Sequence, residues 1–198
     1  MTLTEIIKSV QRCVGVEADG QAGVKTWTAI HKALDINEPA PEPLDGTVDA
    51  RSAKNIETLH PHVRPKARAL IAQAAKMGIK AVITSGTRDY EEQNTLFAQG
   101  RTAKGIVVTN ARGGQSNHNF GIAFDVTIFG GKEPVWDGPE YQTLGTIGVS
   151  LGLEWGGAWK FKDDPHFQLR PDWAKNMSEV AMLAELRERV SQRKDVFA

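Results

Sequence analysis

The chain of 198 residues contains a single cysteine, Cys13, so no disulfide can form within it. Its 24 acidic residues balance its 24 basic residues, which argues against a nucleic-acid partner and against binding to anionic lipid. The sequence has no apolar run of about 18 residues, the length that a membrane-spanning helix requires. We therefore expect a protein that is not inserted in a membrane, and we expect it to be a monomer.

The first residues, Met1 to Lys8, lack the basic start and the uninterrupted apolar core of a secretory signal. We therefore expect a protein that is made in the cytoplasm of its host without a signal peptide. Cys13 lies among apolar residues of an expected helix, which favours a small buried side chain over a reactive thiol.

Histidine is also scarce, with five residues, and two of them stand in segments that contain carboxylates. Residues 116–125 read SNHNFGIAFD, and residues 163–167 read DDPHF. Two neutral imidazoles and one carboxylate oxygen form a three-ligand zinc set that leaves a fourth position for water, as in catalytic sites. Gly121 and the alternating apolar residues after it predict a turn followed by a strand, which would place His118 and Asp125 on one wall of a cleft.

The pattern Ser-x-His-x-x-Gly-x-Ala-x-Asp, followed by Asp-x-Pro-His-Phe, resembles the zinc peptidases of peptidoglycan in the M15 family. The resemblance covers roughly residues 48–170. That family includes D-Ala-D-Ala carboxypeptidases and dipeptidases, and phage endolysins that cut the L-alanyl-D-glutamate bond. By position, the resemblance implies that His118, Asp125 and His166 bind Zn²⁺ and that Asp163 is the catalytic base.

The same resemblance implies roles for three further residues. The Ser-Gly-Thr-Arg segment that ends at Arg88 follows an expected strand, and its arginine would contact the substrate or the scissile bond as a catalytic residue. A guanidinium suits this role because it offers paired donors to a carboxylate or an oxyanion. Ser116 and Gln93 are expected to bind substrate. Glu154 remains the alternative to Asp163 as base, because glutamate is the more usual base in zinc peptidases.

Composition divides the chain into two expected domains and a linker. Residues 1–36 have apolar residues at helical spacing on both sides of a turn, which predicts a small all-α module. Its pattern resembles the peptidoglycan-binding repeat of many wall hydrolases, and the alternative is a helical hairpin that packs on the enzyme. Residues 37–47 are rich in proline and acidic residues and predict an extended linker. Residues 48–198 are the expected zinc peptidase domain.

The expected catalytic domain alternates helices and strands. Helices are predicted at residues 50–59, 64–76, 89–100 and 139–151 and after Ser178. Strands are predicted at residues 79–84, 106–109, 122–129 and 166–169. Alternation by itself is consistent with a parallel sheet. The family resemblance instead implies an α+β fold, in which helices flank a small, largely antiparallel sheet, and we adopt that expectation.

The features together favour an L-alanyl-D-glutamate endopeptidase that acts on peptidoglycan as an endolysin, after release from the cell that makes it. One alternative is a D-Ala-D-Ala carboxypeptidase, which must recognise a terminal carboxylate, whereas an endopeptidase needs a cleft open at both ends. A second alternative is a wall-binding protein that uses a former peptidase scaffold without catalysis. The intact set of ligands argues against this second alternative.

Overall fold

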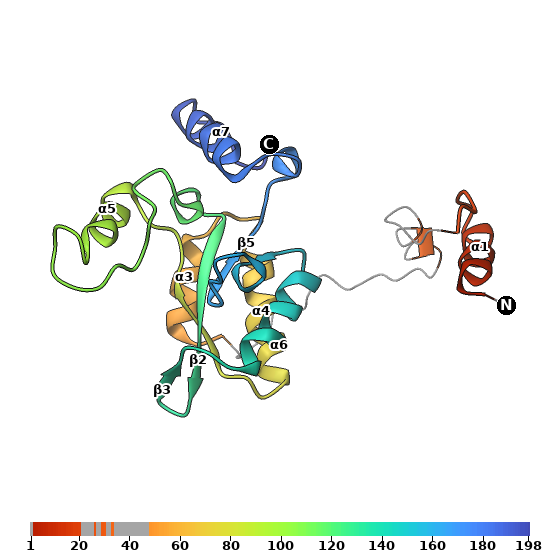
Figure 1. Ribbon diagram of the computed structural model, residues 1–198, viewed down its shortest axis with the longest axis horizontal. Coiled ribbons are helices and arrows are strands. Elements are labelled where there is room, and N and C mark those ends of the chain that lie inside the picture. Colours follow the sequence, from red (N-terminus) through yellow and green to blue (C-terminus); the bar gives the residue numbers. More distant parts are fainter. Residues whose placement is uncertain (1, 21–25, 27–28, 31–32, 34–47) are drawn as a thin grey trace. The chain divides into compact units, whose positions relative to one another are not determined.

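The computed structural model describes residues 2–20, 26, 29–30, 33 and 48–198. The chain divides into two compact units, residues 1–42 and 43–198 (Figure 1). The linker expected at residues 37–47 and much of the expected second helix of the module lie outside the described residues. None of the described helices has the length and apolar character needed to cross a membrane.

In the first unit, helix α1 (Leu3–Cys13) begins with a capping box. The Thr2 hydroxyl accepts a hydrogen bond from Glu5 N, and the Glu5 carboxylate accepts one from Thr2 N at 2.6 Å. This reciprocal pairing satisfies backbone donors that a helix start leaves free. Cys13 is exposed, so the expectation of a buried side chain is wrong. It is the last residue of α1, where the chain turns away.

The buried side chain of Gln11 joins α1 to the turn that follows. Its amide nitrogen donates to Asp19 Oδ1 at 2.7 Å and to Thr26 Oγ1 at 3.0 Å, while its oxygen accepts from Gly20 N at 2.8 Å. A polar side chain can be buried here because both ends of its amide are hydrogen-bonded.

The second unit is built on a small sheet in which every strand pair is antiparallel. Its strands are β1 (Ala81–Ser85), β2 (Ala123–Gly130), β3 (Glu133–Val135), β4 (Glu154–Trp155) and β5 (His166–Gln168). The order across the sheet is β1-β2-β5-β4, and β3 pairs with β2. With the helices described next, this arrangement confirms the predicted α+β fold class.

Helices surround this sheet. They are α3 (Ala50–Thr58), α4 (Arg64–Lys76), α5 (Tyr90–Ala98), α6 (Pro139–Ser150) and α7 (Glu179–Ser191), with 3₁₀ helices η1 (Asn117–Phe120), η2 (Gly156–Ala158) and η3 (Asp172–Ala174). In Figure 1, α4 and α6 lie on one side of β2 and α5 lies on the other. The starts of three helices follow the sequence prediction, since Asp49, Asp89 and Ser178 each accept a hydrogen bond from a backbone N–H of the first turn.

The main core lies between one face of the sheet and helices α3, α4 and α6. Its fully buried side chains include Ile56, Leu70, Ile83, Phe124, Val126, Leu144 and Phe167. Gly148 allows a close approach of α6 to β5, because a Cβ added there would lie 2.5 Å from the Phe167 ring. The opposite face of the sheet is left free for polar residues.

A smaller apolar cluster fixes the segment that carries the first predicted ligand. Phe120 of η1 packs with Ile122, and with Met182 and Leu186 of α7. Because this cluster holds both ends of the turn at Gly121, it fixes the position of η1 against the sheet. Gly121 has a φ of 69°, in the left-handed region that glycine adopts without steric cost.

One predicted strand is wrong. Residues 106–109 form no strand, and Ile106 is 77% exposed. Their β-branched side chains favour extended backbone, but no strand among the described residues pairs with them. They belong to the loop between α5 and η1, where Val108 lines a cavity. The sequence analysis also missed the short strands β3 and β4.

Candidate active site

Alternation along the strands separates an apolar face of the sheet from a polar one. In β2, Phe124 and Val126 enter the core, and the side chains between and beside them point to the opposite face. Asp125 lies on that opposite face. In β5, Phe167 enters the core while His166 and Gln168 share the face of Asp125. The polar face of the sheet is therefore the floor of the site.

The register of β2 and β5 places two predicted ligands directly opposite one another. Asp125 pairs with His166 across these strands, and it pairs with Ser85 of β1 on its other side. Side chains directly opposite in an antiparallel pair lie close enough to interact. Accordingly, Asp125 Oδ1 lies 3.2 Å from Nδ1 of His166.

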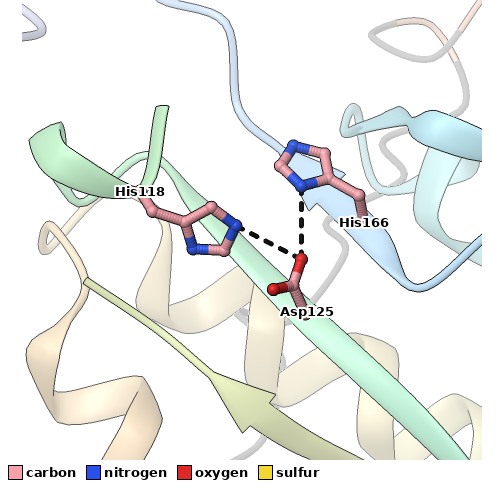
Figure 2. Close-up of side chains that lie close together, drawn as sticks. All are labelled: His118, Asp125 and His166. Atoms are coloured by element: carbon pink, nitrogen blue, oxygen red, sulfur yellow. Dashed lines mark hydrogen bonds and ion pairs between the residues drawn. The ribbon is translucent and has the colours of Figure 1, made fainter. Parts of the chain in front are cut away.

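His118 reaches the same oxygen from η1. Its Nε2 lies 3.2 Å from Asp125 Oδ1, and its side chain is only 3% exposed. Figure 2 shows both imidazoles directed at one carboxylate oxygen. One donor atom from each of the three residues lies within 4.8 Å of the others, a spacing that a single metal ion could bridge. The structure thus brings together all three predicted ligands.

Neighbouring acceptors fix which nitrogen of each histidine faces the centre. His118 Nδ1 lies 2.8 Å from the carbonyl oxygen of Gly86, so Nδ1 carries the proton and Nε2 presents its lone pair. His166 Nε2 lies 3.0 Å from Gln168 Oε1, which leaves Nδ1 for the centre. Such outer hydrogen bonds are characteristic of histidines that bind metal. The three residues therefore fit a divalent ion that accepts nitrogen and oxygen ligands.

The pKa values of Asp125 and His166 are both shifted in this site. Burial raises the pKa of Asp125, but the two imidazoles outweigh it and hold the pKa well below its ordinary value. Burial lowers the pKa of His166, but hydrogen bonding and attraction to Asp125 raise it overall. The site therefore favours a positive charge beside Asp125. A metal cation would take the place of the imidazole proton.

Arg88 lies beside the ligands and is held by three acceptors. Its Nη2 donates to Asp125 Oδ2 at 2.5 Å, its Nε donates to Ser85 Oγ at 3.0 Å, and its Nη1 lies 3.4 Å from Gln93 Oε1. The Arg88–Asp125 contact leaves Oδ1 of that carboxylate for the two imidazoles. Arg88 also lines the cavity above the site, and a guanidinium has five N–H donors, so some remain for a substrate.

Gln93 and Ser116 differ in their access to the cavity. Gln93 is fully buried, and its amide nitrogen donates to Thr109 Oγ1 and to the carbonyl oxygen of Ala111. It therefore lies behind Arg88, and its contact with Arg88 is the way it reaches the site. Ser116 is half-buried and lines the cavity immediately before η1. Direct binding of substrate by either residue stays a prediction.

Asp163 lines the cavity on the loop before β5. Partial burial of its carboxyl and repulsion from Asp125 raise the pKa of Asp163, although His166 and other cations oppose this shift. Among the described residues, no side-chain partner holds its carboxylate. Its backbone is fixed, because Asp163 N donates to Gly156 O at 3.1 Å and Asp163 O accepts from His166 N at 3.0 Å. A Cβ added at Gly156 would lie 2.4 Å from Asp163 O, so this turn requires glycine.

Glu154, the alternative base, is occupied by other partners. Arg170 Nε donates to Glu154 Oε1 at 2.5 Å, and Gln168 Nε2 donates to Glu154 Oε2 at 2.6 Å. Gln168 in turn accepts a hydrogen bond from His166, so Glu154 contacts this predicted ligand only through Gln168. This arrangement favours Asp163 over Glu154 as the group free to move a proton.

The sequence analysis missed this hydrogen-bonded network beneath His166. Gln168 Oε1 also accepts from Asn117 Nδ2 at 2.6 Å, and Arg170 Nη2 donates to Glu179 Oε2 at 2.7 Å. One signal was available in the sequence. His166 and Gln168 are two residues apart in a short expected strand, so their side chains point to the same face of the sheet. Arg170 and Glu179 gave no such signal, because their contact depends on where α7 lies.

An open cavity of about 1130 Å³ contains the site. Trp159, which is 40% exposed, borders it, and its ring lies 5.1 Å from the His166 ring. Trp155 is instead part of the core, so the two tryptophans of this segment have different roles. The cavity is also lined by Pro134 of β3, by Trp136 just after it, by Val108 of the loop after α5 and by Leu183 of α7.

Comparisons with known proteins show which family this chain is similar to. A peptidase M15 family model, described as D-alanyl-D-alanine carboxypeptidase, matches residues 109–169. The peptidoglycan L-alanyl-D-glutamate endopeptidase CwlK of Bacillus subtilis (strain 168) is 44% identical over 125 residues, which cover 58% of this chain and 75% of that protein. The L-alanyl-D-glutamate peptidase of Listeria phage A118 is 31% identical over 124 residues, which cover 60% of this chain and 41% of that protein.

Among solved structures, the L-Ala D-Glu endopeptidase ChiX of Serratia marcescens matches with a TM-score of 0.48 and 24% identity. The match covers 61% of this chain and 87% of that one. The family model spans both segments that carry the ligands, from before His118 to beyond His166. With the 44% identity to the Bacillus protein, this match shows that the chain belongs to the M15 family of metallopeptidases.

Proposed function

We propose that this chain is a zinc-dependent hydrolase of bacterial peptidoglycan that cleaves the L-alanyl-D-glutamate bond, and that it acts as a monomer. The observation that carries the proposal is the convergence of His118, Asp125 and His166 on the polar face of the sheet. Two imidazole nitrogens and one carboxylate oxygen are a donor set typical of catalytic zinc. The Bacillus and phage relatives both bear the name of this activity.

Zinc held by the three side chains would supply a Lewis acid and would lower the pKa of water from about 16 to about 7. Asp163 takes a proton from the attacking water and passes it to the leaving amine nitrogen. Two features suit Asp163 to this transfer. No described side chain engages its carboxylate, and its raised pKa lies closer to neutrality than that of an ordinary aspartate.

Arg88 has two tasks in this proposal. It holds Oδ2 of Asp125, which keeps Oδ1 directed at the two histidines. Its remaining N–H groups donate to the carbonyl oxygen of the scissile bond as negative charge develops there. Gln93 is a positioning residue for Arg88, because it is buried and contacts the guanidinium. Ser116 donates its hydroxyl to the substrate.

The shape of the cavity supports an endopeptidase. Its lining includes Trp136, just after β3, as well as Asp125 and, in α7, Leu183. Figure 1 shows β3 and α7 near opposite ends of β2. A peptide can therefore continue on both sides of the metal ligands, as an endopeptidase requires. A carboxypeptidase, whose substrate ends at the site, would not need a cleft that is open on both sides.

A D-Ala-D-Ala carboxypeptidase is the second candidate, because the matching family model carries that description. Mass spectrometry of muropeptides after digestion separates the two. Cleavage between L-alanine and D-glutamate supports the proposal, and release of a terminal D-alanine alone supports the second candidate. The absence of any cleavage by zinc-loaded protein would favour a wall-binding protein without catalysis.

We also propose that residues 1–36 bind the wall, that residues 37–47 tether them, and that residues 48–198 form the peptidase. Support comes from the resemblance of the first segment to wall-binding repeats and from the ligands, which all lie beyond the linker. In this proposal the enzyme acts as an endolysin after release from the cell that makes it. The similarity to a phage peptidase supports this last point.

Deletion of residues 1–44 tests the division into domains. We expect the truncated protein to cut soluble muropeptides normally but to lose activity on intact sacculi, by up to about 100-fold. The reason is that a tether raises the effective concentration of an insoluble substrate. The ratio of the two activities, before and after truncation, is the measurement. An unchanged ratio would mean that the module does not bind wall, and an equal loss on both substrates would mean that it belongs to the catalytic fold.

A further inference from the structure

The charged residues of the cavity form a nearly complete set of ion pairs. Four carboxylates line it, those of Asp125, Glu154, Asp163 and Glu179. Three guanidinium groups line it as well, those of Arg51, Arg88 and Arg170. Arg88 pairs with Asp125, and Arg170 pairs with both Glu154 and Glu179. These ion pairs include three of the four carboxylates and two of the three guanidinium groups.

Two charged groups of the lining are left without an ion pair to any described residue, and they are Asp163 and Arg51. The proposed mechanism uses Asp163 as the base. It gives no role to Arg51, whose guanidinium also has no hydrogen bond to the residues that the structure describes. An arginine has five donors, and a cleft that excludes part of the solvent strengthens its attraction for an anion. Arg51 is therefore the cation of the cavity that is free to bind a ligand.

The backbone beneath Arg51 is fixed although its side chain is exposed. Asp49 Oδ1 accepts a hydrogen bond from Arg51 N at 3.0 Å, and Ser52 Oγ accepts one from Ile83 N of β1 at 2.8 Å. The start of α3 is thus fastened to the strand that is paired with β2. Thr84, the next residue of β1, lines the same cavity. Arg51 consequently presents its side chain from a rigid element at the edge of the polar face.

The proposed substrate offers an anion on one side of its scissile bond. A glutamyl residue has two carboxyl groups, of which one continues the peptide chain and the other stays free. An L-alanyl-D-glutamate bond therefore always has a carboxylate close to its amine side, unless that group is amidated. Arginine binds carboxylates through paired, charge-assisted hydrogen bonds.

We propose that Arg51 binds this free carboxylate and so selects a glutamyl residue on the amine side of the bond that is cut. The inference rests on the function proposed above. It also gives the substrate a direction. The glutamyl side lies toward the start of α3, where Arg51 lines the cavity, and the alanyl side lies on the other side of the metal ligands.

The test uses two soluble muropeptides that differ only in the free glutamyl carboxylate, which is intact in one and amidated in the other. For the zinc-loaded, full-length protein, we expect amidation to lower kcat/KM by about 10- to 100-fold, the range for loss of a charged hydrogen bond. Arg51→Gln should lower kcat/KM for the intact substrate by a similar factor. In that variant, amidation should have almost no further effect, because the two changes remove one interaction.

Lys54→Gln is the matched control, since it removes a positive charge from the exposed surface of the same helix and does not line the cavity. It should keep the full response to amidation. Arg51→Lys should recover part of the preference, which a purely structural role of the arginine would not explain. Circular dichroism and zinc content verify that each variant is folded and loaded.

The outcomes separate the two proposals. If the unmodified protein does not cut the L-alanyl-D-glutamate bond in either substrate, the proposed function fails and this inference fails with it. If it cuts both substrates equally well, only the role of Arg51 is overturned. If amidation matters but Arg51→Gln responds to it as strongly as the unmodified protein, another group binds the carboxylate and the role of Arg51 is again overturned.

Discussion

The two faces of the sheet are made by the same strands but are stabilised in different ways. On the apolar face, Phe124 and Phe167 stack with ring centroids 5.8 Å apart, and they are held by close packing against the helices. On the polar face, the neighbouring residues Asp125 and His166 are held by ion pairs and hydrogen bonds. Asp125 contacts Arg88 and both imidazoles, and His166 also contacts Gln168. The packing of the apolar face depends on the volume of its side chains. The arrangement of the polar face depends on which hydrogen-bond donors and acceptors each side chain offers.

This difference predicts that substitutions at alternate residues of one strand have different effects. Some should change stability, and the others should change activity. A change on the apolar face should lower the free energy of unfolding and leave the chemistry of the folded molecules unchanged. A change on the polar face should alter metal affinity or turnover, with a smaller effect on folding. Four experiments test this separation, from the largest expected effect to the smallest.

Removal of the metal should abolish activity. We expect about one zinc per chain in the purified protein, bound by His118, Asp125 and His166, and complete loss of turnover after chelation. Restoring zinc should restore activity. Elemental analysis and a muropeptide assay make the measurement, and full turnover by protein that is free of metal would show that the cluster is not the catalytic centre.

Asp163→Asn should lower kcat by at least about 100-fold while zinc stays bound, because the amide cannot accept the proton of the attacking water. Glu154→Gln serves as the comparison, since the Glu154 carboxylate also lines the cavity but is already held by Gln168 and Arg170. Its effect should be smaller. A larger loss from Glu154→Gln than from Asp163→Asn would reverse the assignment of the base.

Neighbouring residues of β5 provide the sharpest contrast. Phe167→Ala should cost about 3–5 kcal/mol in stability, as for other buried phenylalanines, while the folded fraction keeps its turnover. Gln168→Met should instead weaken zinc binding by about 10- to 100-fold, because it removes the acceptor for His166 Nε2. Denaturant unfolding and zinc titration are the two measurements. Similar profiles for the two variants would mean that the faces are not independent.

Asp49→Ala should have the smallest effect, about 1 kcal/mol, through loss of the cap of α3. Burial raises the pKa of Asp49, but hydrogen bonds from Ser52 and Arg51 outweigh it and lower the pKa below its ordinary value of 3.8. The cap therefore contributes fully at pH values above that ordinary value, and its contribution disappears as the pH falls through the lowered pKa. The difference in unfolding free energy between the two proteins should shrink on acidification, and a constant difference would contradict this origin.

The convergence of His118, Asp125 and His166 could be predicted from the sequence because the two motifs that resemble the family are local. The turn at Gly121 and the strand after it fix where His118 and Asp125 point, and these depend on a few adjacent residues. Capped helix starts such as Asp49 were predictable for the same reason. The fold class required the family resemblance, since alternation of helices and strands is compatible with either sheet direction.

Features that depend on distant neighbours could not be predicted. Residues 106–109 have the composition of a strand, but a strand needs a partner, and no strand in the described part of the chain pairs with them. The burial of Gln93 behind Arg88 depends on the loop that contains Ala111, which accepts its hydrogen bond. The role proposed for Arg51 could be inferred only once the charged residues that line the cavity were known.

The pairing of Asp125 with His166 also constrains how the protein folds. These residues are 41 positions apart in the chain, and they meet only when β2 and β5 are aligned in one register. A slip of one residue would turn His166 into the core and Phe167 into the cavity. Contacts between such distant segments form late, because a long loop must first be closed. A zinc ion that binds to both strands would stabilise only the fold in which they are aligned in the native register. The metal would therefore select the correct strand register as well as support catalysis.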